Sequence, residues 1–176
     1  MGKKEIKGNQ KETGFLPTEA PPELANIGEI EVAEESAKRQ NHDVVLQLYE
    51  ALGARDSERM KRLLAVDLEL WFHGPPFHQH MKRLLTGVKD NFQYLRYSIE
   101  NVGATVVAEG TDLSGFVFWV HAWTVSDGLI TQLREYFNTS LTVTSVNSVT
   151  GYHQCVWRSR LPTYAGRSFP GLVLAI

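Results

Sequence analysis

Two histidines, His73 and His121, are the residues of this sequence best suited to proton transfer. His73 ends an alternating apolar stretch just before Gly-Pro-Pro, and His121 lies between Trp119 and Trp123 on one face of an expected strand. An imidazole with a pKa near neutrality can act as a general base, and a second imidazole can donate a hydrogen bond to a developing oxyanion. The alternative is structural, because a histidine on an apolar strand can simply pack and hydrogen-bond with its neighbours.

Arg134 is a candidate for ligand recognition. It shares one face of the following strand with Tyr136, whereas Glu135 points to the other face. If the face of Arg134 is turned inward, the planar guanidinium suits a carboxylate or phosphate on a ligand. If it is turned outward, Arg134 and Glu135 are charges on the sheet at a dimer seam. Of the two, we expect the inward arrangement.

A metal site is suggested only by His73, His78 and His80. Their H-x4-H-x-H spacing crosses the Gly-Pro-Pro break, and no cysteine or well-placed carboxylate completes a tetrahedral set. We therefore expect no metal and no cofactor. The sequence also contains no phosphate-binding loop, dinucleotide fingerprint or nucleophile elbow.

The element that must position His121 is a long β-hairpin. Two runs rich in β-branched and aromatic residues, 115–125 and 129–138, flank the dipeptide Asp127-Gly128. Asp-Gly tolerates positive φ at both turn positions, so it favours a tight hairpin turn. Both faces of the first run are largely apolar, and we expect both to be covered.

The remaining chain predicts an α+β domain in which helices precede a run of antiparallel strands. Apolar periodicity predicts a helix from about Ile30 to Gly53, a second over 57–64 that is capped by Asp56, and a third over 77–86. Besides the hairpin, strands are expected over 66–73, 91–101, 105–109 and 139–146.

The chain ends differ in composition from its centre. We expect residues 1–28 to form a disordered leader, 29–150 the folded domain, and 151–176 a C-terminal extension docked on it. The net charge of −2 gives no reason to expect a nucleic-acid partner. Because no early apolar run suits a signal peptide or membrane span, we expect an intracellular protein without membrane insertion, in the cytoplasm and also compatible with the nucleus.

Four separated motifs resemble the plant wound-induced protein family, a branch of the nuclear-transport-factor-2-like (NTF2-like, SnoaL-like) superfamily. They are Trp71–Pro76, the hairpin from His121 to Gly128, Arg134–Thr139 and Pro170–Ile176. The resemblance implies a cone-shaped NTF2-like fold, in which a strongly curved antiparallel sheet and three N-terminal helices enclose one pocket. It also implies a homodimer through the sheet.

The superfamily includes ketosteroid isomerase, polyketide cyclases, limonene epoxide hydrolase and carriers without catalytic activity, so the fold leaves the chemistry open. The resemblance implies a stress- or wound-responsive plant protein that binds a small hydrophobic molecule, or that assists metabolic enzymes without catalysing a step. The alternative is an isomerase or cyclase that transfers protons on a terpenoid, steroid-like or polyketide substrate.

Site residues follow from the same resemblance. The carboxylate base of the isomerase branch falls at or beside His73, the acid at or beside His121, and the helix tyrosine at Leu48 or its neighbour Tyr49. The carboxylate pair of that branch is therefore absent from these positions. The residues expected to line the pocket are Tyr49, Trp71, Tyr94, Trp119, Trp123, Arg134 and Tyr136.

Overall fold

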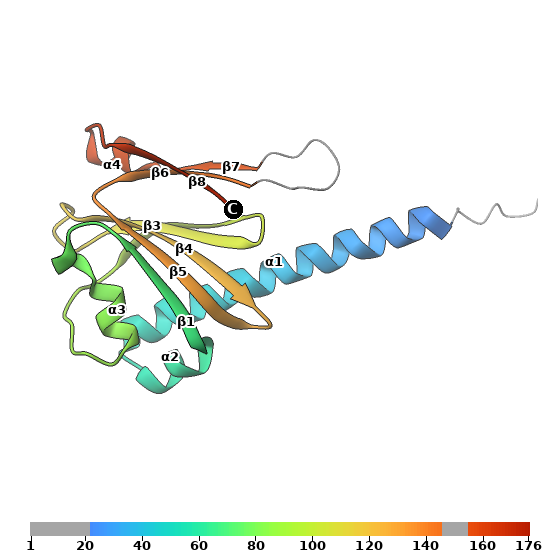
Figure 1. Cartoon of the computed structure of the whole chain (residues 1–176), viewed down its shortest axis with the longest axis horizontal. Coiled ribbons are helices and arrows are strands. Elements are labelled where there is room, and N and C mark those ends of the chain that lie inside the picture. The colour runs from blue at the N-terminus through green and yellow to red at the C-terminus, as the bar shows by residue number, and fades with distance from the viewer. Residues whose placement is uncertain (1–21, 146–154) are drawn as a thin grey trace, which may run out of the picture. The chain divides into compact units, whose positions relative to one another are not determined.

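The computed structural model describes residues 22–145 and 155–176 (Figure 1). Residues from Glu34 onward form one compact unit, and every site described below lies within it. The elements of the described residues are α1 (Pro22–Ala54), α2 (Ser57–Leu63), β1 (Leu64–His73), the 3-10 helix η1 (Pro76–His78), α3 (His80–Leu85), β2 (Leu95–Val102), β3 (Thr105–Thr111), β4 (Phe118–Ser126), β5 (Leu129–Phe137), β6 (Ser140–Thr144), β7 (Val156–Arg158), α4 (Leu161–Ala165) and β8 (Gly171–Ala175).

α1 is the first helix that the sequence predicts. It ends at Ala54, next to the predicted stop at Gly53, and it begins at Pro22 instead of near Ile30. Most of the predicted leader, up to residue 21, lies outside the described residues, as does the predicted boundary at residue 150. The division of the chain into leader, domain and extension therefore stays a prediction.

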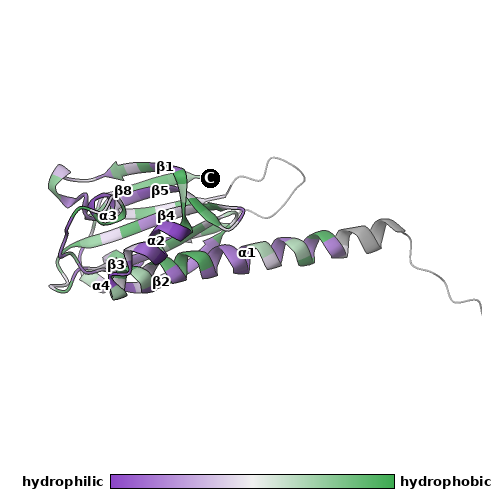
Figure 2. Cartoon of the chain, turned by 90° about the horizontal axis from the view of Figure 1, so that it is seen from below, coloured by the Kyte–Doolittle hydropathy of each residue, from purple (hydrophilic) through white to green (hydrophobic). Residues whose placement is uncertain are grey.

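α2 begins where its capping residue predicts. The side chain of Asp56 accepts a hydrogen bond from the backbone N–H of Arg59 at 2.9 Å, which satisfies one of the free donors of the first turn. Met60 is its buried residue, and its other side chains are mostly charged. α2 is accordingly coloured mostly hydrophilic in Figure 2.

The predicted hairpin is confirmed as β4 and β5. Asp127 and Gly128 form its turn, with φ of 51° and 76°, in the left-handed region that this dipeptide accommodates. Close to the turn, the pairing shifts register between Thr124 and Val125, where β5 contains one extra residue. Because strand side chains alternate, this bulge decides which residues of β5 share a face with His121.

The main sheet has five strands in the order β1-β5-β4-β3-β2. It is mixed, and not antiparallel as expected, because β1 pairs with β5 in parallel. A short turn forces neighbouring strands to be antiparallel, as it does for β4 and β5. β1 reaches the sheet without such a turn, since η1 and α3 follow it, and its direction is not restricted in this way.

Both faces of β4 are covered, as expected. α1, α2 and α3 contribute to the hydrophobic core on the face of Trp119 and Trp123, which we call the inner face. The opposite, outer face is covered by a second sheet of three strands, in the order β7-β6-β8. Figure 1 shows the second sheet on one side of the main sheet and α2 and α3 on the other. The predicted α+β class is confirmed, with helices on one face and strands on the other.

The C-terminal strand belongs to the second sheet. β8 pairs in parallel with β6, from Ser140 opposite Gly171 to Thr144 opposite Ala175. Leu174 and Ile176 pack against the core on the outer face. In the part of the chain that the structure describes, no helix has both the length and the apolar content needed to cross a membrane.

Candidate functional site

The inner face carries a buried histidine–carboxylate pair. His121 and Glu135 lie opposite each other on β4 and β5, with exposed fractions of 0% and 2%. Nε2 of His121 is 3.1 Å from Oε1 of Glu135. Because a buried carboxylate requires hydrogen-bond donors, this contact orients both side chains.

The second nitrogen of His121 contacts α1. The hydroxyl of Tyr49 lies 2.6 Å from Nδ1 of His121, and the indole N–H of Trp123 donates to the same hydroxyl at 3.2 Å. The ring of Tyr49 also stacks on Trp119, with their centroids 5.9 Å apart. Tyr49 therefore connects the helix to three successive inward side chains of β4.

One arrangement of protons satisfies all of these contacts. The Tyr49 hydroxyl accepts from Trp123 and donates to Nδ1 of His121, and the Nε2–H of His121 then donates to Glu135. This arrangement requires a neutral imidazole beside an ionised carboxylate. A protonated His121 would leave the hydroxyl hydrogen of Tyr49 without an acceptor among the described residues. The four side chains thus form one directed hydrogen-bond chain.

Tyr94 supplies a second donor to the carboxylate. Its hydroxyl donates to Oε1 of Glu135 at 2.9 Å. Burial, and then the nearby charge of Glu135, raises the pKa of Tyr94 well above its ordinary value. Burial also raises the pKa of Tyr49. Both phenols therefore stay protonated at physiological pH and act as hydrogen-bond donors.

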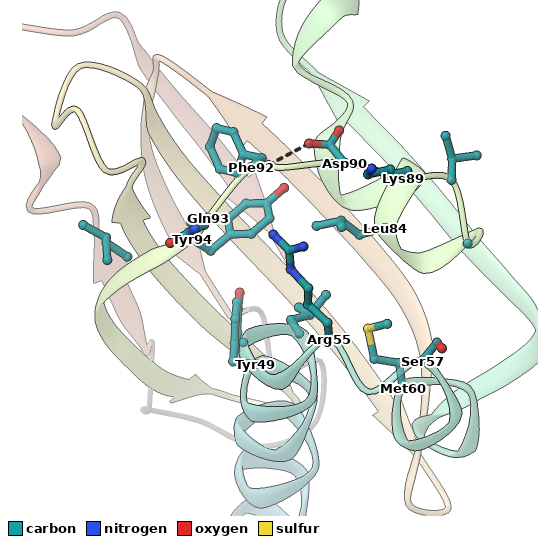
Figure 3. Close-up of a pocket in the computed structure, with 15 residues that line it drawn as sticks. Tyr49, Arg55, Ser57, Met60, Leu84, Lys89, Asp90, Phe92, Gln93 and Tyr94 are labelled. Carbon is teal, nitrogen blue, oxygen red and sulfur yellow. Dashed lines mark hydrogen bonds between the residues drawn. The ribbon is translucent and has the colours of Figure 1, made fainter.

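Tyr49 and Tyr94 also line a pocket of about 390 Å³ (Figure 3). The pocket is formed by the end of α1, by α2, by the end of α3 and by the segment 87–95. Its other lining residues are Leu52, Gly53, Arg55, Ser57, Met60, Leu84, Gly87, Val88, Lys89, Asp90, Phe92, Gln93 and Leu95. A volume of this size is typical of sites for small molecules.

Asp90 holds the segment 87–95 in place. Its carboxylate accepts hydrogen bonds from Nε of Arg83 at 2.6 Å and from the backbone N–H of Phe92 at 2.8 Å, and it lies 3.1 Å from Nδ1 of His80. Burial acts to raise the pKa of Asp90, but these hydrogen bonds outweigh it, so the pKa lies below its ordinary value. Asp90 is therefore an ionised anchor for one wall of the pocket.

The predicted site residues divide between the two faces of the sheet. Tyr49, Tyr94 and the β4 residues Trp119, His121 and Trp123 meet on the inner face. Only the two tyrosines line the 390 Å³ pocket, because the β4 side chains lie deeper in the core.

The other four predicted residues lie on the outer face. His73 is opposite Tyr136 and stacks on its ring, with centroids 4.7 Å apart, and Trp71 is opposite Arg134. These four side chains and residues 172–174 of β8 line a second hollow of about 270 Å³. The inward arrangement expected for Arg134 and Tyr136 is therefore not observed.

His73 and His121 are not brought together. Tyr136, which is paired with His73, is paired with Val120 across β4, whereas His121 is paired with Glu135. Directly paired residues share a face of a sheet. The two histidines therefore lie on opposite faces and share no cavity.

The three histidines with metal-like spacing do not meet at one place. His73 lies on the outer face, while His80 is held between Asp90 and Arg83, with its Nε2 3.4 Å from Nδ1 of His78. Among residues 22–145 and 155–176, no group of three or more His, Cys, Asp and Glu side chains is arranged to hold a metal ion.

Sequence reasoning missed Glu135 as a site residue. Alternation places it on the same side of β5 as the apolar Leu133 and Phe137, which are both buried in the inner core. A carboxylate between two core positions needs a buried partner, and His121 is the titratable residue of the facing strand. A carboxylate on the core side of β5, opposite a strand that carries a histidine, was the sequence feature that could have identified Glu135.

A family model described as the wound-induced protein WI12 matches residues 81–176. The chain belongs to the wound-induced protein WI12 family. The resemblance inferred from the sequence is thereby confirmed.

Two plant proteins are similar to the chain. Wound-induced protein 1 of Solanum tuberosum is 51% identical over 104 residues, which cover 53% of this chain and 99% of that protein. Senescence associated gene 20 of Arabidopsis thaliana is 42% identical over 109 residues, with coverage of 53% and 99%.

Solved structures similar to this WI12-family chain include an NTF2-like protein of unknown function from Cytophaga hutchinsonii, with 18% identity, a TM-score of 0.44 and coverage of 55% of this chain and 88% of that one. An LEH-like epoxide hydrolase of M. tuberculosis has 23% identity, a TM-score of 0.46 and coverage of 56% and 83%. The main sheet of this chain is mixed, in place of the antiparallel sheet that the resemblance implied.

Proposed function

We propose that this WI12-family chain is a wound-responsive plant protein that holds a small hydrophobic molecule in the 390 Å³ pocket. The observation that carries the proposal is the wall formed by Tyr49 and Tyr94. Their rings offer apolar surface to the pocket, and their hydroxyls are fixed behind it by His121 and Glu135. A rigid wall lowers the entropic cost of binding, because the side chains are ordered before the ligand arrives.

The opposite wall supports a hydrophobic ligand. Met60 of α2, Leu84 of α3 and Phe92 line the pocket, and Figure 3 shows Met60 and Leu84 across it from Tyr94. Apolar surface removed from water on binding stabilises a complex by about 25 cal/mol per Å² before the costs of association. A ligand with an apolar ring therefore has contacts on both sides.

Native mass spectrometry of the tagged chain, isolated from wounded plant tissue, tests this function. We expect a molecule of about a few hundred daltons to co-purify, which is the size that such a pocket encloses. Leu84→Trp fills the pocket and should lose the molecule. Leu113→Trp is the matched control, because Leu113 is 63% exposed and lies outside the pocket. Isolation of an empty chain, or equal retention by both variants, contradicts the proposal.

A second candidate function is proton transfer by an isomerase or cyclase. The chain from Tyr49 through His121 to Glu135 favours it. In such a step the Tyr49 oxygen takes a proton from a substrate carbon, the phenolic proton passes to Nδ1 of His121, and the Nε2 proton passes to Glu135. The substrate is left as a carbanion or enolate, and returning the protons completes an isomerisation.

Deuterium exchange separates the two functions. The co-purified molecule is incubated in D₂O with the wild-type chain or with His121→Gln, and uptake of deuterium at carbon is followed by mass spectrometry. Catalysis requires uptake above the rate in buffer that is lost in His121→Gln while the molecule stays bound. Uptake no faster than in buffer contradicts the enzymatic function and leaves binding as the function.

A further inference from the structure

Positively charged residues outnumber negatively charged ones around the pocket. Arg55 and Lys89 line it, and the guanidinium of Arg96 lies over the ring of Tyr49 at 5.4 Å from the ring centroid. Asp90 is the one carboxylate among the lining residues, and it is already occupied by Arg83 and the backbone N–H of Phe92. The pocket therefore has an excess of positive charge.

Neither Arg55 nor Lys89 makes an ion pair with any residue that the structure describes. Other cations in the unit do find carboxylates, for example Arg59 with Glu50 at 2.8 Å. The two pocket cations are thus available to a ligand.

Arg55 has an unusual backbone for an arginine. The N–H of Asp56 donates to the carbonyl of Ala51, and the N–H of Arg55 donates to the carbonyl of Leu52. This is a Schellman motif that ends α1, and its left-handed position, here with φ of 54°, is normally taken by glycine. An arginine in this conformation costs on the order of 1 kcal/mol, and such strained residues gather at functional sites.

The side chain of Arg55 is directed into the pocket. Figure 3 shows it extending from the end of α1 into the space between Tyr94 and Leu84. The guanidinium therefore lies beside apolar lining residues, and Arg55 itself is solvent-exposed, so a ligand that enters the pocket can reach it. Because salt screens exposed charges, the attraction to a bound anion depends on ionic strength.

We propose that the pocket selects small cyclic carboxylic acids, whose carboxylate binds Arg55 and whose ring packs against Met60, Leu84 and Phe92. Lys89 and Arg96 add positive charge around the carboxylate. The inference rests on the proposed function, because it names the ligand class of the same pocket. The planar guanidinium suits a carboxylate because two parallel N–H groups can donate to its two oxygens.

Two probes that share a naphthalene ring, one with a carboxylate and one with a neutral hydroxymethyl group, test the acid preference. They are 2-naphthoate and 2-naphthalenemethanol, titrated at pH 7 into the purified full chain by isothermal calorimetry. We expect 2-naphthoate to bind at least ten-fold more tightly than the alcohol, with an advantage that shrinks as salt is added. Equal affinities would show that the pocket binds rings without selecting acids. If neither probe binds, the pocket function itself is contradicted.

A matched pair of variants tests whether Arg55 binds the carboxylate of the ligand. Arg55→Gln should reduce the affinity for 2-naphthoate about ten-fold and leave the affinity for the alcohol unchanged. Arg62→Gln is the control, since Arg62 is an exposed residue of α2 outside the pocket, and it should change neither affinity. An Arg55→Gln chain that keeps the full affinity for 2-naphthoate overturns the assignment. Because the alcohol reports on the pocket itself, loss of both affinities would reveal a collapsed pocket and also overturn it.

Discussion

The hydroxyl of Tyr49 lies 2.6 Å from Nδ1 of His121, and the two residues come from α1 and the central strand β4. Few other polar contacts in the described residues join the helical layer to the centre of the sheet. The other ring nitrogen of His121 contacts Glu135, and Tyr49 lines the pocket. The same contact thus fixes the helix on the sheet and orients one pocket wall.

Removing the Tyr49 hydroxyl should destabilise the domain. Tyr49→Phe leaves Nδ1 of His121 and the indole N–H of Trp123 without their partner in a buried site, at a cost of about 1–3 kcal/mol. Urea unfolding followed by tryptophan fluorescence measures the change. Tyr164→Phe is the matched control, because Tyr164 is 46% exposed, and its loss should stay within about 0.5 kcal/mol. Equal stability of the two variants would mean that the buried hydrogen bonds of Tyr49 contribute nothing to the stability of the domain.

The two histidines should respond differently to the same substitution. His121→Phe breaks contacts with Tyr49 and Glu135 and leaves the carboxylate with one donor fewer, so we expect a loss of about 2–4 kcal/mol. His73→Phe keeps an aromatic ring against Tyr136 at an exposed position and should cost less than about 0.5 kcal/mol. Thermal unfolding compares them. A larger loss from His73→Phe would contradict the separation of the two faces.

The Asp90 anchor predicts a dependence on pH. Its folded pKa lies below the ordinary value of 3.8, so its contribution to stability is present above pH 3.8 and is lost as the pH falls through the folded pKa. Asp90→Asn should therefore cost about 1.5–3 kcal/mol at pH 7. The difference from wild type should shrink as the pH falls below 3.8.

The control for the Asp90 anchor is Asp67→Asn. Asp67 is exposed on β1, so its substitution should change stability by less than about 0.5 kcal/mol at either pH. Urea midpoints at pH 7 and at pH 3 give both comparisons. An Asp90→Asn loss that is the same at the two pH values would rule out the ionised anchor.

Relief of the backbone strain at Arg55 should stabilise the folded chain. Arg55→Gly places the residue with the lowest left-handed cost at the Schellman position, and we expect a gain of about 0.5–1 kcal/mol. For a domain of this size that corresponds to a Tm increase of about 1–4 °C. Ala54→Gly, inside the last turn of α1, should lower the Tm. A lower Tm for Arg55→Gly would show that its side chain matters more to folding than its backbone.

Local patterns predicted the features that local forces control. The Asp127-Gly128 turn, the Asp56 cap and the alternation that groups Trp119, His121 and Trp123 each depend on residues close together in the chain. They were correct because turn, cap and pleat geometry follow from residue type and spacing.

The orientation of Arg134 was wrong because it depends on a bulge. A regular hairpin that starts with Ser126 opposite Leu129 would pair His121 with Arg134. The register shift between Thr124 and Val125 pairs His121 with Glu135 instead, and turns Arg134 outward. Nothing in the composition of the strands predicts that extra residue. The sequence alone therefore could not distinguish pairing of His121 with Arg134 from pairing with Glu135.

The parallel pairing of β1 with β5 has a consequence for folding kinetics. β4 and β5 are joined by a two-residue turn and can associate early, whereas Leu64 must find Ile130 across a long intervening chain. The entropy of closing that loop delays the docking of β1. α2 directly precedes β1 and α3 closely follows it, so the helices that complete the pocket reach their places late. A ligand present during folding would therefore act on its last steps.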